Sequence, residues 1–385
     1  MVVLRWLQRL GPPIAALGAA ALLASASGGP TAGAGAPPCD GSPAGALAAA
    51  RAVEPATAAN VAAETWFTLD PQLDGAGALT GQRLQFGRRN GRTQTLDLPG
   101  ESFVAGPFGG TILVGADDGS TSTIRAISGS ADCESLIATV ADVVRTATLD
   151  RTADNVYEFR VERSTRADLG VWRRPLAGGP ATRVLEPLPV DERFGRTFST
   201  TLSWTEEGDE LVVQSCGMTS CRTRFLAVVS GRVRTVGAAD QGELIGAVAG
   251  RLIAYAACRG LPCPILSIDA ATGDSRTLVD TAGLARVVPT DDGAAVIHEI
   301  VSRHAVAGEA VALAAVDPTT GDRRPVGGSV SGMRLVADAT RSLGGTRLPR
   351  GWALLTPDGR PAADEPSILI RVADGATVAL PEVLP

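Results

Sequence analysis

The sequence predicts an all-β fold, a β-propeller of seven four-stranded blades. From about residue 62 onward, apolar runs of five to seven residues alternate with turns rich in Gly, Asp, Asn and Thr. No stretch in this part sustains the period of an amphipathic helix. A turn followed by an Arg-x-aliphatic strand also recurs, with an average step of about 47 residues, and four-stranded propeller blades repeat at about 40–50 residues.

Each copy of the repeat ends on an aliphatic residue, namely Leu96, Leu136, Leu185, Val236, Leu278, Val326 and Leu380. The copies predict blades at 62–98, 101–140, 143–187, 198–238, 242–280, 284–328 and 331–381. Six or eight blades are the alternatives, because the first two lack a clear hairpin motif. A ring must also join its two chain ends, and we expect residues 61–69 to form the closing strand.

The turns of the repeat have a clear chemistry. In Asp269-Ala-Ala-Thr-Gly273 and Asp317-Pro-Thr-Thr-Gly321, the Asp side chain can accept backbone hydrogen bonds at the start of the turn. The Gly supplies a positive φ at its end. We expect both turns to join the third and fourth strands of a blade.

A second motif is a strand, an acidic-Gly turn and another strand. It occurs at 203–213, around Glu207-Gly208, and at 288–297, around Asp292-Gly293. These segments resemble the W-S-P-D-G hairpin of TolB-like, WD40-like propeller repeats, although the central Pro is missing from both. Residues 172–185 resemble the other half of that repeat. The resemblance covers about residues 62–385 and implies the fold, while it is silent about a ligand.

The N-terminus resembles an export signal. Arg5 and Arg9 form a positive region, residues 14–26 form an uncharged apolar run, and Ala24-Ser25-Ala26 is a small-x-small cleavage site. The run is shorter than the ~20 residues of a membrane-spanning helix. We therefore expect a signal peptide at 1–26, a flexible Ala/Gly/Pro-rich arm at 27–60 and the propeller at 61–385. An uncleaved N-terminal anchor is the alternative.

The six cysteines are consistent with an oxidising compartment. Cys216 and Cys221 form one close pair, and Cys258 and Cys263 form another at the equivalent place one repeat later. We expect disulfides within both pairs, at the tips between the second and third strands of adjacent blades. A zinc site made from these four thiols is the competing interpretation. By elimination, the remaining two cysteines pair with each other and attach the arm to the ring: Cys39 and Cys133.

Composition and motifs exclude several kinds of function. The net charge is −6, so nucleic-acid binding is not expected. The two histidines, His298 and His304, have no Gly-x-Ser-x-Gly elbow to serve as a nucleophile. No calcium loop, phosphate loop or dinucleotide fingerprint occurs, so we expect no catalytic residue, cofactor or metal site. Residues 115–121 partly resemble the Asp-box turn of sialidase-type propellers, but an ordinary hairpin explains them.

Arginine clusters are the remaining candidates for chemistry, because every one of the 35 basic residues is arginine. A minority interpretation gives some of them an anion site: Arg160, Arg163 and Arg166, Arg173 and Arg174, and Arg323 and Arg324.

The sequence thus predicts an exported, monomeric, non-catalytic propeller that binds an envelope or extracellular protein or a small ligand, with no transmembrane segment after cleavage near Ala26. The alternative is a glycoside-active or lyase-type propeller enzyme, with carboxylates of raised pKa at the central channel. A structural envelope protein without a specific ligand is a third interpretation.

Overall fold

The structure is a computed structural model of the chain. It describes residues 65–76, 79–88, 93–99, 102–108, 111–128, 133–150, 152–188, 199–205, 208–217, 221–236, 242–248, 250–256, 261–291, 293–300, 311–330, 333–336, 342–344, 348, 350–356 and 368–379. The predicted signal peptide and arm, and with them Cys39, lie outside these residues, as do Cys258 and His304.

The described chain forms seven antiparallel sheets of four strands each, which we call blades 1 to 7. Blade 1 has β25 (Ser342–Gly344), β1 (Thr65–Leu73), β2 (Leu79–Arg88) and β3 (Thr93–Pro99). Blade 2 has β4 (Ser102–Phe108), β5 (Thr111–Asp117), β6 (Ser122–Ser128) and β7 (Cys133–Val140). Blade 3 has β8 (Val143–Leu149), β9 (Asn155–Val161), β10 (Asp168–Pro175) and β11 (Thr182–Leu185).

The other four blades follow in chain order. Blade 4 has β12 (Ser199–Trp204), β13 (Glu210–Cys216), β14 (Cys221–Ala227) and β15 (Val233–Thr235). Blade 5 has β16 (Leu244–Val248), β17 (Arg251–Tyr255), β18 (Cys263–Asp269) and β19 (Ser275–Ala282). Blade 6 has β20 (Ala285–Thr290), β21 (Gly293–Ile300), β22 (Val311–Val316) and β23 (Arg323–Val330). Blade 7 has β24 (Arg334–Leu335), β26 (Trp352–Thr356), β27 (Ile368–Arg371) and β28 (Thr377–Ala379).

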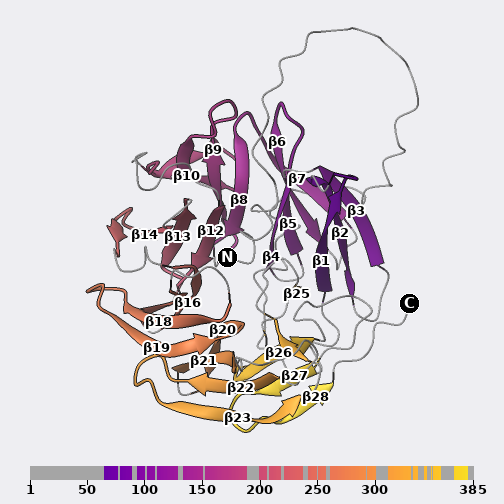
Figure 1. The fold of residues 1–385 in the computed structure, drawn as a ribbon. Helices are drawn as coiled ribbons and strands as arrows, with labels where there is room; N and C mark the ends of the chain where they lie inside the picture. The colour runs from indigo at the N-terminus through magenta and orange to yellow at the C-terminus, as the bar shows by residue number, and fades with distance from the viewer. Residues whose placement is uncertain are drawn as a thin grey trace.

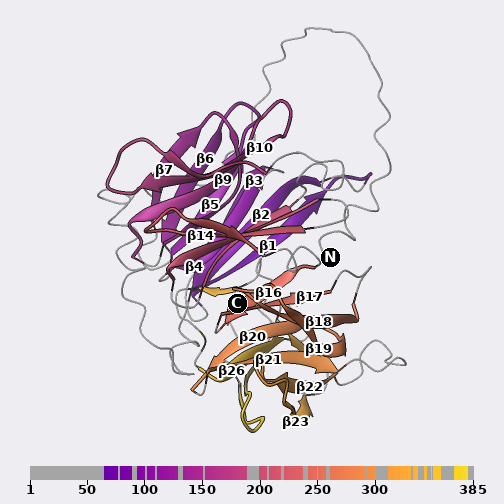
Figure 2. The ribbon, with the colours of Figure 1, turned by 90° about the vertical axis from the view of Figure 1, so that its left-hand side faces the viewer.

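The blades follow one another around a ring, from indigo β1 to yellow β28 (Figure 1). A quarter turn places β5, β6 and β9 above β18, β21 and β22 (Figure 2). In each of blades 2 to 7 the first strand in the chain is the innermost and the last is the outermost. The number of blades agrees with the sequence prediction, because the repeat marks the turn before each outermost strand. Their limits agree as well, except that β25, within the predicted seventh blade, belongs to blade 1.

The closing strand differs from the prediction. We expected residues 61–69 to close the ring, but β1 pairs along its whole length with β2, as the second strand of blade 1. The innermost strand of that blade is β25. In the chain β25 lies between β24 and β26 of blade 7, but it pairs with Thr65, Trp66 and Phe67 of β1. The reason is that β1 has two edges that need hydrogen bonds, and β2 satisfies only one of them.

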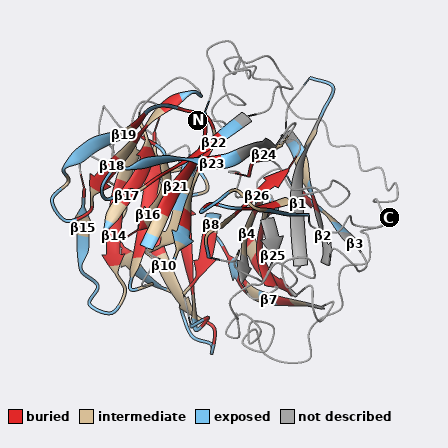
Figure 3. Cartoon of the chain, turned by 90° about the horizontal axis from the view of Figure 1, so that it is seen from below, coloured by how far each residue is buried: buried red, intermediate tan, exposed pale blue. Residues whose placement is uncertain are grey.

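Buried aliphatic side chains fill the spaces between consecutive blades. The Val, Leu, Ile and Ala residues of one blade pack on those of the next at each junction from blade 1 to blade 7. Figure 3 shows burial concentrated in the middle strands, such as β21, while outer strands such as β19 are largely exposed. The core therefore lies between the sheets, as sheets that are apolar on both faces require.

The repeated arginine of the outermost strands connects neighbouring blades. Arg234 donates to the carbonyl oxygen of Ala270, in the turn between the third and fourth strands of the next blade. Arg276 donates in the same way to Pro318, at 3.1 Å, and Arg324 to Ala373, at 3.2 Å. The Arg-x-aliphatic pattern is thus explained, because the aliphatic residue packs inward while the arginine reaches across to the next blade.

The two Asp-x-x-Thr-Gly turns join the third and fourth strands of blades 5 and 6, as predicted. The Oδ1 atom of Asp269 accepts hydrogen bonds from two turn N–H groups at 2.9 Å, and Asp317 does the same at 2.6 and 2.8 Å. Gly273 and Gly321 close these turns with φ values of +81° and +85°.

Candidate functional site

The disulfide, the buried ion pairs between blades and several exposed apolar side chains lie at one face of the ring. In blades 2 to 7 the innermost strand begins at this face and the antiparallel second strand returns to it, so the tips between second and third strands also lie there. We call it the disulfide face, because the tip of blade 4 carries a disulfide. Cys216 and Cys221 pair across β13 and β14, with a Cα–Cα distance of 3.9 Å and an S–S distance of 2.06 Å.

The tip of blade 5 lies at the equivalent position in the next blade. Cys263 begins β18 and is also disulfide-bonded. The predicted bonds from Cys258 to Cys263 and from Cys39 to Cys133 each involve a residue outside the described part of the chain, so both stay predictions. Exposed apolar side chains accompany these tips, with Leu261 in blade 5 at 37% exposure and Ile300 at the end of β21 in blade 6 at 39%.

A buried carboxylate joins blades 6 and 7 at this face. Glu299 of β21 is fully buried and accepts two hydrogen bonds from the guanidinium of Arg334, at 2.8 and 2.7 Å. It also accepts the backbone N–H groups of Leu284, at 3.2 Å, and Leu335, at 3.0 Å. The bonds to Glu299 raise the pKa of Arg334. One carboxylate therefore holds the beginning of two adjacent innermost strands.

Sequence reasoning missed this arrangement, although a signal was present. Gln214 lies in β13 at the position equivalent to Glu299, with the same 85-residue offset as Gly208 and Gly293. Its Oε1 accepts the N–H of Leu244 at 2.9 Å, where the innermost strand of blade 5 begins. A polar residue six positions after the hairpin Gly, in an otherwise apolar strand, thus marks a junction between blades.

The innermost strands carry charge of one sign only. Among β4, β8, β12, β16, β20, β24 and β25, the charged residues are Arg145, Arg286 and Arg334, and none is Asp or Glu. They are the third, second and first residues of β8, β20 and β24, so all three lie near the disulfide face. The carboxylates that a propeller enzyme was expected to have at the channel are absent from these seven strands.

A second buried ion pair joins blades 2 and 3 at the same face. Asp117 ends β5, and its two carboxylate oxygens accept hydrogen bonds from Arg163 at 2.8 Å each and one from Ser122 at 2.6 Å. Burial alone would raise the pKa of Asp117. The bonds from Arg163 and Ser122, together with the charge of Arg163, lower it to about 2.

This pair is expected to make stability depend on acid pH. The folded pKa of about 2 lies below the ordinary 3.8, so the stabilisation is complete above 3.8 and lost as pH falls through 2. It amounts to at most about 2 kcal/mol. Urea unfolding from pH 5 downward is the measurement, with Asp117→Asn as the comparison. The gap between wild type and variant should shrink towards pH 2, and a pH-independent gap would contradict the assignment.

The other predicted candidates have structural roles. His298 lies buried in β21 with its Nδ1 3.1 Å from the carbonyl oxygen of Glu299, and burial lowers its pKa. The Asp-box-like segment is a hairpin in which Asp118 accepts the N–H groups of Ser120 and Thr121, at 2.8 and 2.7 Å. Of the arginine clusters, Arg160 and Arg174 both bond to buried Glu158, at 2.6 and 2.5 Å.

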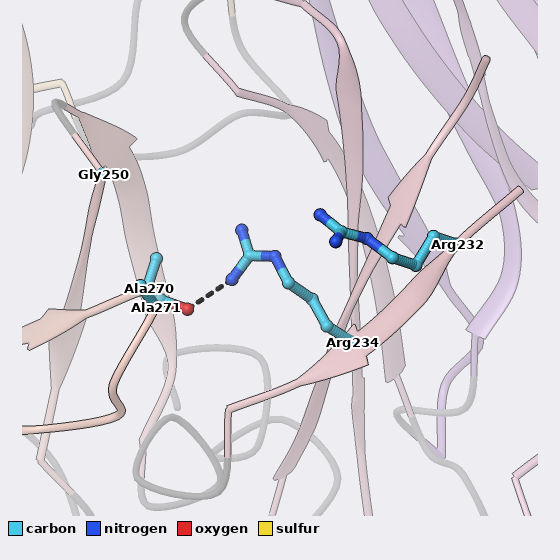
Figure 4. A pocket seen from close by; sticks show the side chains of 5 residues that line it. All are labelled: Arg232, Arg234, Gly250, Ala270 and Ala271. Carbon is cyan, nitrogen blue, oxygen red and sulfur yellow. Dashed lines mark hydrogen bonds between the residues drawn. The ribbon is translucent and has the colours of Figure 1, made fainter. Parts of the chain in front are cut away.

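A shallow hollow of about 380 Å³ lies between blades 4 and 5 (Figure 4). Arg232 and Arg234 extend into it towards Gly250, Ala270 and Ala271. The guanidinium of Arg234 is occupied there by Glu210, 2.5 Å away, and by the ring of Phe225, 3.9 Å away, besides its bond to Ala270. We therefore assign this hollow to the contact between blades.

Among the described residues, no group of three or more His, Cys, Asp or Glu side chains is placed to hold a metal ion. In the same part of the chain, no helix has the length and apolarity that a membrane crossing requires. Each described carboxyl group with a resolved pKa shift is shifted downward: Asp117, Asp118, Asp269 and Asp374.

No protein-family model and no curated protein sequence matches this chain. Solved structures match it at low identity. A prolyl endopeptidase is 12% identical with a TM-score of 0.51, over 87% of this chain and 53% of that one. The chain is a seven-bladed β-propeller. It spans about half the length of that endopeptidase.

Two other similar structures are of comparable length to this propeller. The propeller domain of the trilobed protease from Pyrococcus furiosus is 10% identical, with a TM-score of 0.49, over 83% of this chain and 93% of that one. TolB from Acinetobacter baumannii is 10% identical, with a TM-score of 0.40, over 83% and 80%. At these identities the likeness concerns the fold alone.

Proposed function

We propose that this protein is an exported, non-catalytic binding module that recognises its partner through the disulfide face. The observation that carries the proposal is the adjacency of three tips on blades 4 to 6. One is closed by the disulfide between Cys216 and Cys221, the next contains disulfide-bonded Cys263 and exposed Leu261, and the third begins at exposed Ile300. Exposed apolar side chains favour association, and a disulfide across the ends of β13 and β14 limits the order that is lost there on binding.

Two further observations support a binding role over the enzyme alternative. That alternative expects converging carboxyl groups with raised pKa values. The innermost strands have arginine as their charged residue, and Glu299, the buried carboxylate beside them, is neutralised by Arg334. The disulfide between Cys216 and Cys221 and the disulfide-bonded state of Cys263 also favour an oxidising compartment, which is where the proposal places the protein.

Binding at the disulfide face is tested with a charge-introducing double variant, L261D/I300D. Wild-type protein on a resin should enrich one envelope or extracellular component, which is then purified and titrated directly. The double variant should bind it at least about tenfold more weakly, because charge at an apolar contact centre is costly. V229D is the matched control, since Val229 is 98% exposed in the turn between β14 and β15 on the opposite face.

Equal losses in both variants, or none in the double variant, would show that the partner binds elsewhere. Turnover of glycoside or uronate substrates by the wild-type protein would refute the non-catalytic part of the proposal.

Export is tested separately by sequencing the N-terminus of protein recovered from its native source. Cleavage after Ala26 should leave a chain that begins at Ser27, because the segment before it has the charge and apolar pattern that signal peptidase recognises. Recovery of an intact Met1 in the membrane fraction would instead indicate an N-terminal anchor.

A further inference from the structure

Arg286 differs from the other arginines that join or line the blades. It lies in β20, the innermost strand of blade 6, where it is only partly exposed. Among the described residues it has no hydrogen-bond or ion-pair partner, whereas Arg334 in the next blade has a bidentate carboxylate partner. Burial lowers the pKa of Arg286, and no neighbouring charge offsets this effect.

An unpaired charge in a partly buried position costs free energy, because the protein replaces water without supplying counter-charge. Other arginines at blade junctions have carboxylate partners: Glu158 pairs with Arg160, and Asp117 pairs with Arg163. Arg286 therefore stands out as a guanidinium without a counter-ion in the described part of the chain. Such groups are concentrated at functional sites.

The surroundings of Arg286 add to its preference for an anion. Arg145 and Arg334 lie within the first three residues of their own innermost strands, at the same end of the ring, and no Asp or Glu lies in any of the seven innermost strands. Glu299 neutralises Arg334, and the bonds from Glu299 to Arg334 and to the N–H of Leu284 place Arg334 close to the beginning of β20. The innermost strands therefore carry only basic charged residues, in a protein whose net charge is −6.

We propose that Arg286 binds an oxyanion at the ring axis on the disulfide face. The ligand chemistry is a group of closely spaced carboxylate or phosphate oxygens, because a guanidinium forms two parallel hydrogen bonds with such groups. This inference rests on the proposed function for its biological meaning, since it describes the chemistry of a partner at the same face. Anion binding is nevertheless measurable without any partner.

The test is calorimetric titration of the full propeller with citrate and, in a separate arm, inorganic pyrophosphate at low ionic strength. Saturable binding is expected in at least one arm, and the arm that binds more tightly identifies carboxylate or phosphate as the preferred source. R286Q should weaken binding by about tenfold or more, and R286K by less, because lysine keeps the charge but loses the fork. R350Q is the control of equal charge change, since Arg350 is exposed, and it should leave the affinity within about twofold.

A thermal readout keeps the test independent of calorimetric heat. The tighter anion should raise the melting temperature of wild type and not that of R286Q. R286Q should melt no lower than wild type without anion, because it removes an uncompensated charge; if it does not fold, R286M is used in its place. No saturable binding in either arm, or equal affinities in wild type and R286Q, would overturn the proposal. Unchanged partner binding in L261D/I300D, with anion binding lost only in R286Q, would refute the docking face alone.

Discussion

Replacing Glu299 by alanine is expected to lower the free energy of unfolding by about 3 kcal/mol, because the change leaves several groups unsatisfied at once. The carboxylate is fully buried and accepts the guanidinium of Arg334 and the N–H groups of Leu284 and Leu335. Arg334 is 42% exposed and can be rehydrated, so most of the loss comes from the two backbone donors and from the cavity. Urea denaturation, read as the change in midpoint at constant slope, measures the effect.

Two controls separate the role of Glu299 from general sensitivity to loss of a carboxylate. E299Q keeps an acceptor for the backbone donors and should lose less stability than E299A. E134A removes the partner of Arg125 from a pair whose side chains are 23% and 40% exposed, so it should cost less than about 1 kcal/mol. Equal losses in E299A and E134A would show that Glu299 does not hold the junction of blades 6 and 7.

Replacing Gly170 by alanine is expected to destabilise blade 3 by about 2–5 kcal/mol, for two reasons that add. Gly170 has a φ of +81°, which a residue with a side chain adopts only at a cost. A Cβ there would also lie 2.0 Å from the carbonyl oxygen of Leu185, at the bulge where β10 pairs with β11. The outermost strand must then move away from its neighbour. Urea denaturation again gives the size of the loss.

Gly321→Ala is the matched control for this effect. Gly321 has nearly the same φ, +85°, but a Cβ added there would meet nothing within 4 Å. It should therefore lose only the conformational part, about 1–2 kcal/mol. If G170A and G321A lose the same amount, the close approach of β11 does not contribute.

The blades could be predicted from the chain because their signals are local. An Asp that bonds the next N–H groups, a Gly at positive φ and an aliphatic residue that must be buried all lie within about ten residues, as in the turn that ends at Gly273. The tip of blade 4 was predictable for the same reason. Cys216 and Cys221 are separated by one hairpin tip, so their spacing already brings them together.

The charged site depends on contacts between distant segments. Glu299 and Arg334 are 35 residues apart, and Asp117 and Arg163 are 46 apart, with no motif connecting either pair. The pattern around Arg286 shows only an arginine in an apolar strand, and not that it has no partner among the described charged groups. The closing strand, Ser342–Gly344, is too short to carry a recognisable hydrophobic pattern. Its place in blade 1 depends on its hydrogen bonds with the edge of β1.

The sequence by itself determined that this chain is a ring of seven blades with a disulfide-closed tip on blade 4, since blades 2 to 7 are each formed by neighbours along the chain. Only the tertiary structure decided which strand closes the ring, which carboxylates join the blades and which arginine remains unpaired. The physical reason is that hydrogen-bond and charge partners are chosen by distance in space, and in a ring the neighbour across a blade junction lies some 35 to 50 residues away in the chain.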